Sequence, residues 1–176
     1  MRIYVETNGK KTSWGYRELA EVMWFKEKNG KELEISHVGN DETLRNSFYL
    51  SLSLDKWLND ERWKKEKSPL QFQDIELNYH KEKKIIEIVS KHVKILTVDE
   101  RAMYILTIEL AKDLGGRISE NGSENWQSVA EFEKNHKDIL SLTYDKANDL
   151  SLKEAVTMVA EEEPWEYDED FEVEDE

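Results

Sequence analysis

The 176-residue chain contains no cysteine. This absence excludes a disulfide framework, a thiolate nucleophile and a zinc site with cysteine ligands. No apolar run approaches the roughly 18–20 residues that a membrane-spanning helix needs. The first residues also lack the long apolar region of a signal peptide. We therefore expect a soluble cytoplasmic protein that is not bound to a membrane.

Basic residues are missing from one part of the chain. Residues 161–176 read EEEPWEYDEDFEVEDE, with eleven acidic residues and neither lysine nor arginine. The whole chain has 39 acidic and 25 basic residues and a net charge of −14, whereas residues 1–160 alone carry only −3. The sequence thus predicts two parts, a single folded domain over 1–160 and an acidic, aromatic tail over 161–176.

The tail has two interpretations. Dense like charge is typical of a solvated, disordered end. The tail also contains three large aromatic residues, however, and these favour an arm that docks onto a basic surface of a partner protein or folds back over the protein's own sheet. Charge would then speed the encounter and the aromatic side chains would slow release. The candidate partner-binding residues are Trp165, Tyr167, Asp168, Glu169, Asp170 and Phe171.

Apolar spacing predicts strands in the middle of the chain and helices on either side of them. The clearest strand is expected over 46–54, where apolar side chains alternate with serine and tyrosine. A hairpin is expected from runs at 70–79 and 84–90, and shorter strands over 3–7 and 32–38. Helices are expected mainly over 16–28, 56–66 and 97–114. This order favours an α+β fold with a mainly antiparallel sheet flanked by helices.

Helix boundaries are marked by local signals. Three segments have the pattern of a capping box, in which the first and fourth residues satisfy each other's backbone N–H groups: Thr97–Glu100, Ser128–Glu131 and Ser151–Glu154. Gly115 and Gly116 supply a left-handed stop after the long helix. A small hairpin is expected around Asn121–Gly122.

No motif in the sequence specifies a chemistry. The nucleophile-elbow, phosphate-loop and dinucleotide-binding patterns are all missing, and no two of the four histidines have the i, i+4 spacing of a helical metal site. We therefore predict no catalytic residue, no metal ligand and no cofactor. Lysine-rich stretches are interrupted by glutamate, which disfavours nucleic-acid binding.

Two alternatives to a binding protein remain open. Asp74 and Glu76 lie on one face of a predicted strand, with Glu87 on the next strand, as in a metal-dependent hydrolase. The same pattern is typical of the solvated face of an antiparallel sheet. In the second alternative, the acidic side chains imitate the phosphates of DNA.

Residues 99–136 read DERAMYILTIELAKDLGGRISENGSENWQSVAEFEKNH. A helix ending in Leu-Gly-Gly, then a strand, a polar turn, a tryptophan and a short helix with phenylalanine resembles a segment of small bacterial immunity proteins from polymorphic toxin systems. The residues that carry the resemblance are Leu110, Leu114, Gly115, Gly116, Ile118, Trp126 and Phe132. The resemblance implies an acidic, cytoplasmic bacterial protein that binds and blocks a toxin, commonly a basic nuclease, without catalysis. We therefore predict a non-catalytic protein-binding protein of bacterial or phage type that engages a partner with a basic surface.

Overall fold

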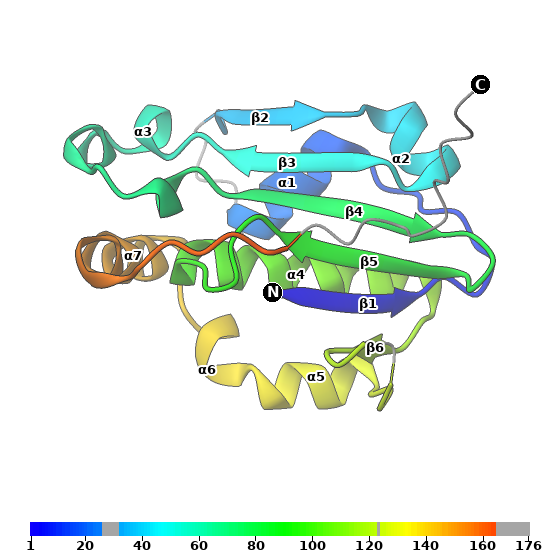
Figure 1. Ribbon diagram of the computed structural model, residues 1–176. Helices are drawn as coiled ribbons and strands as arrows, with labels where there is room; N and C mark the ends of the chain where they lie inside the picture. The colour runs from blue at the N-terminus through cyan, green and yellow to red at the C-terminus, as the bar shows by residue number, and fades with distance from the viewer. Residues whose placement is uncertain (26–31, 123, 165–176) are drawn as a thin grey trace, which may run out of the picture.

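An antiparallel sheet forms the centre of the fold (Figure 1). The computed structural model describes residues 1–25, 32–122 and 124–164, which contain six strands in the order β2-β3-β4-β5-β1-β6. The strands are β1 (Arg2–Glu6), β2 (Ile35–Val38), β3 (Leu50–Leu54), β4 (Asp74–His80), β5 (Ile85–Ser90) and β6 (Ile118–Ser119). Every neighbouring pair is antiparallel, which confirms the predicted α+β class.

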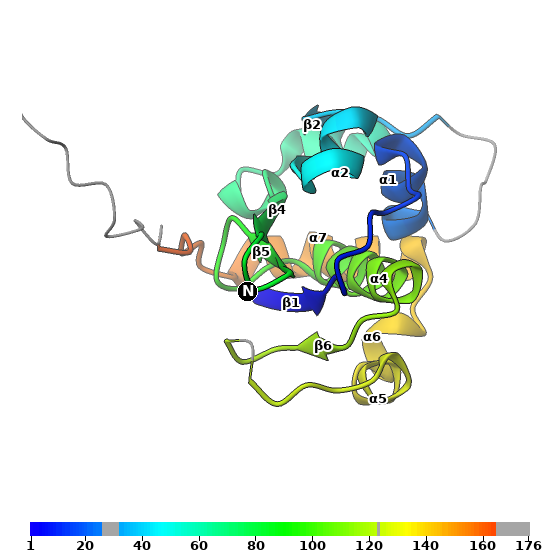
Figure 2. The same ribbon diagram turned by 90° about the vertical axis from the view of Figure 1, so that its right-hand side faces the viewer.

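The helices that the structure describes lie on one face of this sheet (Figure 2). The helices in the described residues are α1 (Tyr16–Trp24), α2 (Asp41–Ser47), α3 (Lys56–Asn59), α4 (Thr97–Leu114), α5 (Val129–Asn135), α6 (Lys137–Leu140) and α7 (Tyr144–Thr157). Two 3-10 turns, Glu61–Lys65 and Pro69–Gln71, follow α3. Helix α4 packs against α1, α7 and β1, and it is buried on nearly all sides. No helix in these described segments is both long and apolar enough to cross a bilayer.

Strand alternation divides the sheet into an apolar face and a polar face. On β3 and β4, Leu52, Leu54 and Ile75 are at most 1% exposed and point into the core. Their neighbours Ser53 and Asp74 lie opposite each other on the other face. Because no helix of the described residues lies over that face, we call it the open face. Most of the side chains that β1, β5 and β4 present on it are polar.

The strand predicted over 46–54 begins only at Leu50. Its first residues belong to α2, a helix that the sequence analysis missed. Asn40 and Thr43 form a reciprocal capping box at the start of α2, and this local nucleation outweighs the strand alternation that follows. Phe48 ends the helix in a left-handed conformation with φ of 52° and is still buried.

The helix predicted over 56–66 is also divided. Helix α3 has only four residues, and a 3-10 turn begins after Asp60. Asp55 was the expected cap, but its carboxylate instead accepts a hydrogen bond from Ser36 Oγ at 3.0 Å. Helix α1 ends at Trp24, and the last residues of its predicted range lie outside the described residues.

Helix α4 has the predicted bounds but not the predicted cap. Its N-cap residue is Leu96, which has no side-chain oxygen. The cap comes from α7: Glu154 Oε1 accepts from Thr97 N at 3.0 Å, and Ser151 Oγ accepts from Val98 N at 2.9 Å. The residues predicted to cap their own helix therefore cap another one. The Ser128–Glu131 box is confirmed, as is the left-handed stop at Gly115, with φ of 63°.

This cross-helix cap gives a direct prediction. We expect Ser151→Ala to destabilise the protein by about 1–2 kcal/mol, because it leaves the buried Val98 N–H without an acceptor. Urea unfolding measures the loss. Thr97→Val is the matched control, since it removes the hydroxyl of the residue that a local capping box would use. A larger loss for Thr97→Val than for Ser151→Ala would show that α4 is capped locally after all.

A buried ion pair lies between α3 and α4. Lys56 Nζ is 2.8 Å from Asp99 Oδ2, and these side chains are 1% and 0% exposed. The Lys56 ammonium also donates to the carbonyl of Gln71 at 2.9 Å, and Trp24 Nε1 donates to Asp99 Oδ1 at 3.4 Å. Asp99 Oδ2 lies close to the ammonium without the alignment of a good hydrogen bond, so the attraction is mainly between charges.

Candidate binding cleft on the open face

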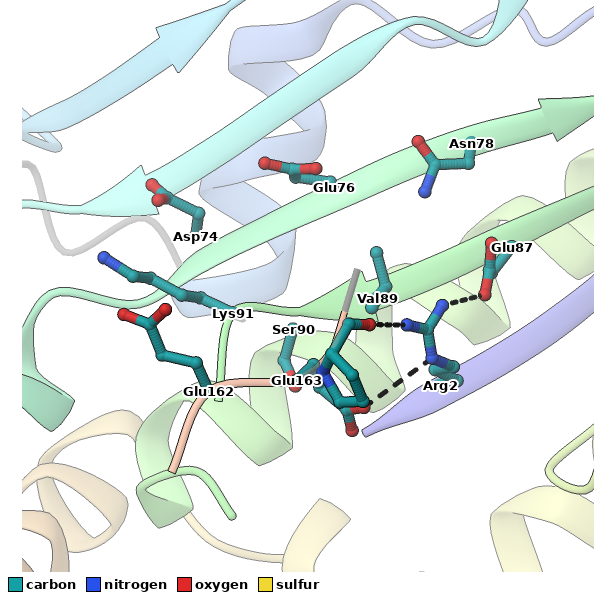
Figure 3. A pocket seen from close by; sticks show the side chains of 11 residues that line it. Arg2, Asp74, Glu76, Asn78, Glu87, Val89, Ser90, Lys91, Glu162 and Glu163 are labelled. Carbon is teal, nitrogen blue, oxygen red and sulfur yellow. Dashed lines mark hydrogen bonds and ion pairs between the residues drawn. The ribbon is translucent and has the colours of Figure 1, made fainter. Parts of the chain in front are cut away.

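A cleft of about 280 Å³ lies on the open face of the sheet, where β4, β5 and β1 run beneath the C-terminal segment (Figure 3). We call it the acidic cleft. Its lining residues are Arg2, Asp74, Glu76, Asn78, Glu87, Val89, Ser90, Lys91, Glu162, Glu163 and Pro164. Five of these are carboxylates and two are cations, so the lining is negative overall.

Residues 161–164 form one wall of this cleft by pairing with the chain that follows β5. Val93 N donates to the carbonyl of Glu161, and Glu163 N donates to the carbonyl of Lys91, both at 2.8 Å. Arg2 Nη2 donates to the carbonyl of Pro164 at 2.9 Å. The start of the predicted tail, residues 161–164, is thus attached to the sheet.

One half of the cleft is held by ion pairs around Arg2. The guanidinium contacts Glu87 and Glu163, and Glu87 also lies 3.3 Å from His80 Nε2. Burial alone would raise the pKa of Glu87, but the hydrogen bond and charge of Arg2, with a smaller contribution from His80, lower that pKa. Glu87 is therefore an ionised carboxylate that is already committed to Arg2.

The other half of the cleft is not internally paired. Within the part of the chain that the structure describes, the side chains of Asp74, Glu76, Lys91 and Glu162 form no hydrogen bond or ion pair with one another or with a neighbour. Asp74 and Glu76 point from β4 toward the cleft, and Lys91 extends toward Asp74 and Glu162 (Figure 3). Burial, and then the charge of Asp74, raises the pKa of Glu76. This half thus has three carboxylates and one ammonium.

The hydrolase alternative names three acids, and all of them line the acidic cleft: Asp74, Glu76 and Glu87. They are not arranged to share a metal ion, because Glu87 is bound to Arg2 in the half of the cleft away from Asp74 and Glu76. Across 1–25, 32–122 and 124–164, no three histidine, aspartate or glutamate side chains are placed to share a metal. A cationic organic group, which needs one or two carboxylates, fits the unpaired half better.

The other residues considered in the sequence analysis lie elsewhere. The predicted partner-binding residues fall within 165–176 and are outside the described residues. Leu110, Leu114, Ile118 and Phe132, which carry the resemblance to immunity proteins, are core residues at 0% exposure. They position α4, β6 and α5 and do not form a surface.

Sequence reasoning missed Arg2 and Glu162 as site residues. They come from the two ends of the chain, and no spacing in the sequence brings them together. The sequence offered one signal of a nearby cation, namely Glu87, an acid within the apolar run of β5. A carboxylate in such a run is expected to be buried and so to need a cationic partner, and Glu87 is indeed only 4% exposed.

Comparison of the chain with protein-family models, curated proteins and solved structures finds no match.

Proposed function

We propose that this is a non-catalytic protein-binding protein. It engages a partner protein by contacting a basic surface of that partner. The observation that carries this proposal is the position of residues 161–164, which attach the start of the acidic tail beside the acidic cleft. The sequence beyond Pro164 adds eight acidic residues and no basic one. The negative charge of the cleft and of this acidic sequence complements a positively charged partner.

The sharpest form of this proposal is an immunity or inhibitor protein of bacterial or phage type. Such a protein acts by occupying a partner and needs no catalytic group of its own. The resemblance of residues 99–136 supports this form. An open sheet face with a negative cleft also suits the role, because it offers a wide, rigid platform for a protein partner.

The tail is tested by capture experiments with two forms of the protein. The full chain and a chain ending at Pro164 serve as bait in lysate of the source cells, at low and high salt. Ending the chain at Pro164, instead of at the predicted boundary of residue 160, keeps the pairing of Glu161 and Glu163 with the sheet.

We expect the full chain to recover a basic protein at low salt and to lose it at high salt, because salt screens exposed charges. With the purified partner, removal of residues 165–176 should weaken binding by about tenfold or more, mainly through slower association. Recovery of no basic partner by the full chain would contradict the proposed function. Equal affinity of both forms would place the binding site on the folded domain alone.

A further inference from the structure

We propose that the unpaired half of the acidic cleft receives the guanidinium group of an arginine side chain of the basic partner. This inference rests on the proposed function and names the contact that the folded domain makes. It concerns Asp74, Glu76 and Asn78 of β4, with Val89 as the floor and Glu162 on the opposite wall.

The size of the cleft suits one side chain. Pockets for drug-sized ligands or cofactors usually enclose about 300–1,000 Å³. The acidic cleft, at about 280 Å³, lies just below this range. Its lining comes from side chains on the open face of β4, β5 and β1 and from residues 162–164, so a side chain of a protein docked on that face can reach it.

The charges of the cleft select a cation. Arg2 is bound to Glu87 and Glu163, so both carboxylates of that half already have a cationic partner. Asp74, Glu76 and Glu162 are opposed only by Lys91 among the cleft residues. The partly buried Glu76 is held close to Asp74 without a cation of its own, and this repulsion is relieved when a cation binds. The tail does not supply that cation, because it contains no basic residue.

The geometry favours arginine over lysine. Asp74 and Glu76 are separated by two residues on one strand, and such side chains stand about 7 Å apart on the same face. A planar guanidinium has five donors and can bridge two carboxylates, whereas an ammonium acts as a single point of charge. Asn78 lies next along the same face and offers an amide oxygen as a further acceptor.

The floor of the cleft suits the apolar part of an arginine side chain. Val89 lies between Arg2 and Glu76 in the register of the sheet and is 9% exposed. Pro164 adds a second apolar surface on the wall. Methylene groups that pass over these residues would be removed from water while the guanidinium stays with the carboxylates.

The test uses the full chain and two blocked tripeptides, Gly-Arg-Gly and Gly-Lys-Gly, followed by NMR at about 150 mM salt, where exposed charges are screened over about 8 Å. We expect Gly-Arg-Gly to shift the backbone amides of Asp74–Asn78 and Val89–Lys91 in a saturable way. Gly-Lys-Gly should bind there about threefold or more weakly, because it cannot bridge two carboxylates. Shifts confined to 165–176, or equal binding of both peptides, would overturn the inference.

Variants assign the binding to the cleft. Glu76→Gln keeps the shape of the side chain, removes its charge and should weaken Gly-Arg-Gly binding about three- to fivefold. Asp74→Asn is a second variant with the same expectation. Glu18→Gln is the matched control, because Glu18 is exposed on α1, behind the opposite face of the sheet, and should leave binding unchanged. Unchanged binding in both cleft variants would overturn the inference.

The inference and the proposed function fail in different ways. If capture of a basic partner depends on residues 165–176 but neither peptide shifts β4, the proposed function stands and the cleft is not its arginine site. If Gly-Arg-Gly binds the cleft but no basic partner is captured, the cleft is a guanidinium site and the proposed protein partner is wrong.

Discussion

Lys56→Met should destabilise the protein by about 3–5 kcal/mol, the largest loss that we expect from a change of a single charged residue. The ammonium of Lys56 is the cation at 2.8 Å from Asp99, and both side chains are buried. Without it, the carboxylate keeps only the hydrogen bond from Trp24. Chemical denaturation of both proteins at neutral pH measures the difference.

The loss in Lys56→Met should depend on pH in a defined direction. Burial raises the pKa of Asp99, and the charge of Lys56 opposes that rise. In the variant, the folded-state pKa of Asp99 therefore rises further above the unfolded value, so the folded protein binds a proton more readily than the unfolded chain. Stability is then greatest at low pH and is lost as the pH rises through the folded-state pKa. We expect a smaller destabilisation at pH 5 than at pH 8.

The double variant Lys56→Met/Asp99→Leu is the control for this pair. Replacing both charges by apolar groups removes the uncompensated carboxylate, so most of the stability should return. A double-mutant cycle with the two single variants then gives the coupling energy. A loss below about 1 kcal/mol in Lys56→Met would show that water reaches Asp99 and that the pair is not buried as described.

Gly116→Ala should have the second large effect, about 3 kcal/mol or more. An added Cβ at this position would lie 1.9 Å from the carbonyl oxygen of Glu6, a backbone atom of β1. One strand must shift to relieve this contact, and the shift would disturb the ion pair of Glu6 with Arg117 at 2.8 Å. A thermal scan should show a fall in Tm of about 6–12 °C for a chain of this size.

Gly122→Ala is the control that distinguishes the cost of a steric contact from the cost of a strained backbone conformation. Gly122 has φ of 67° and no atom within 4 Å of the added Cβ, so only the conformational cost of about 1 kcal/mol is expected. Gly116 carries no such positive φ, and its cost arises from the contact. Equal effects of the two substitutions would show that β1 does not approach Gly116 as closely as described.

The sequence predicted the features of this fold that depend on neighbouring residues. Alternation located β3, β4 and β5, and apolar spacing with a glycine stop located α4 at its observed bounds. Errors arose where two local signals competed. At 46–54, a strand-like alternation overlaps the end of a helix that begins after the Asn40 cap. The overlapping residues, 46 and 47, are helical.

Contacts between distant segments could not be predicted in the same way. Ser151 and Glu154 have the spacing of a capping box, but they face the first turn of α4, and only the packing of α7 on α4 decides that. The lining of the cleft was likewise only partly predictable. Its acids on β4 and β5 were predicted to share a face, but Arg2 and Glu162 come from opposite ends of the chain, and their approach to the cleft was not predicted.

The cap that α7 supplies to α4 also sets an order of assembly during synthesis. Val98 and Ser151 are 53 residues apart, so the ribosome adds Ser151 roughly 3–10 s after Val98. Until then, the first turn of the central helix has unsatisfied N–H groups, and the nascent sheet lacks a complete cover. The domain therefore reaches its final structure only after α7 has emerged, and a nascent chain stalled before residue 151 should remain a substrate for chaperones and proteases.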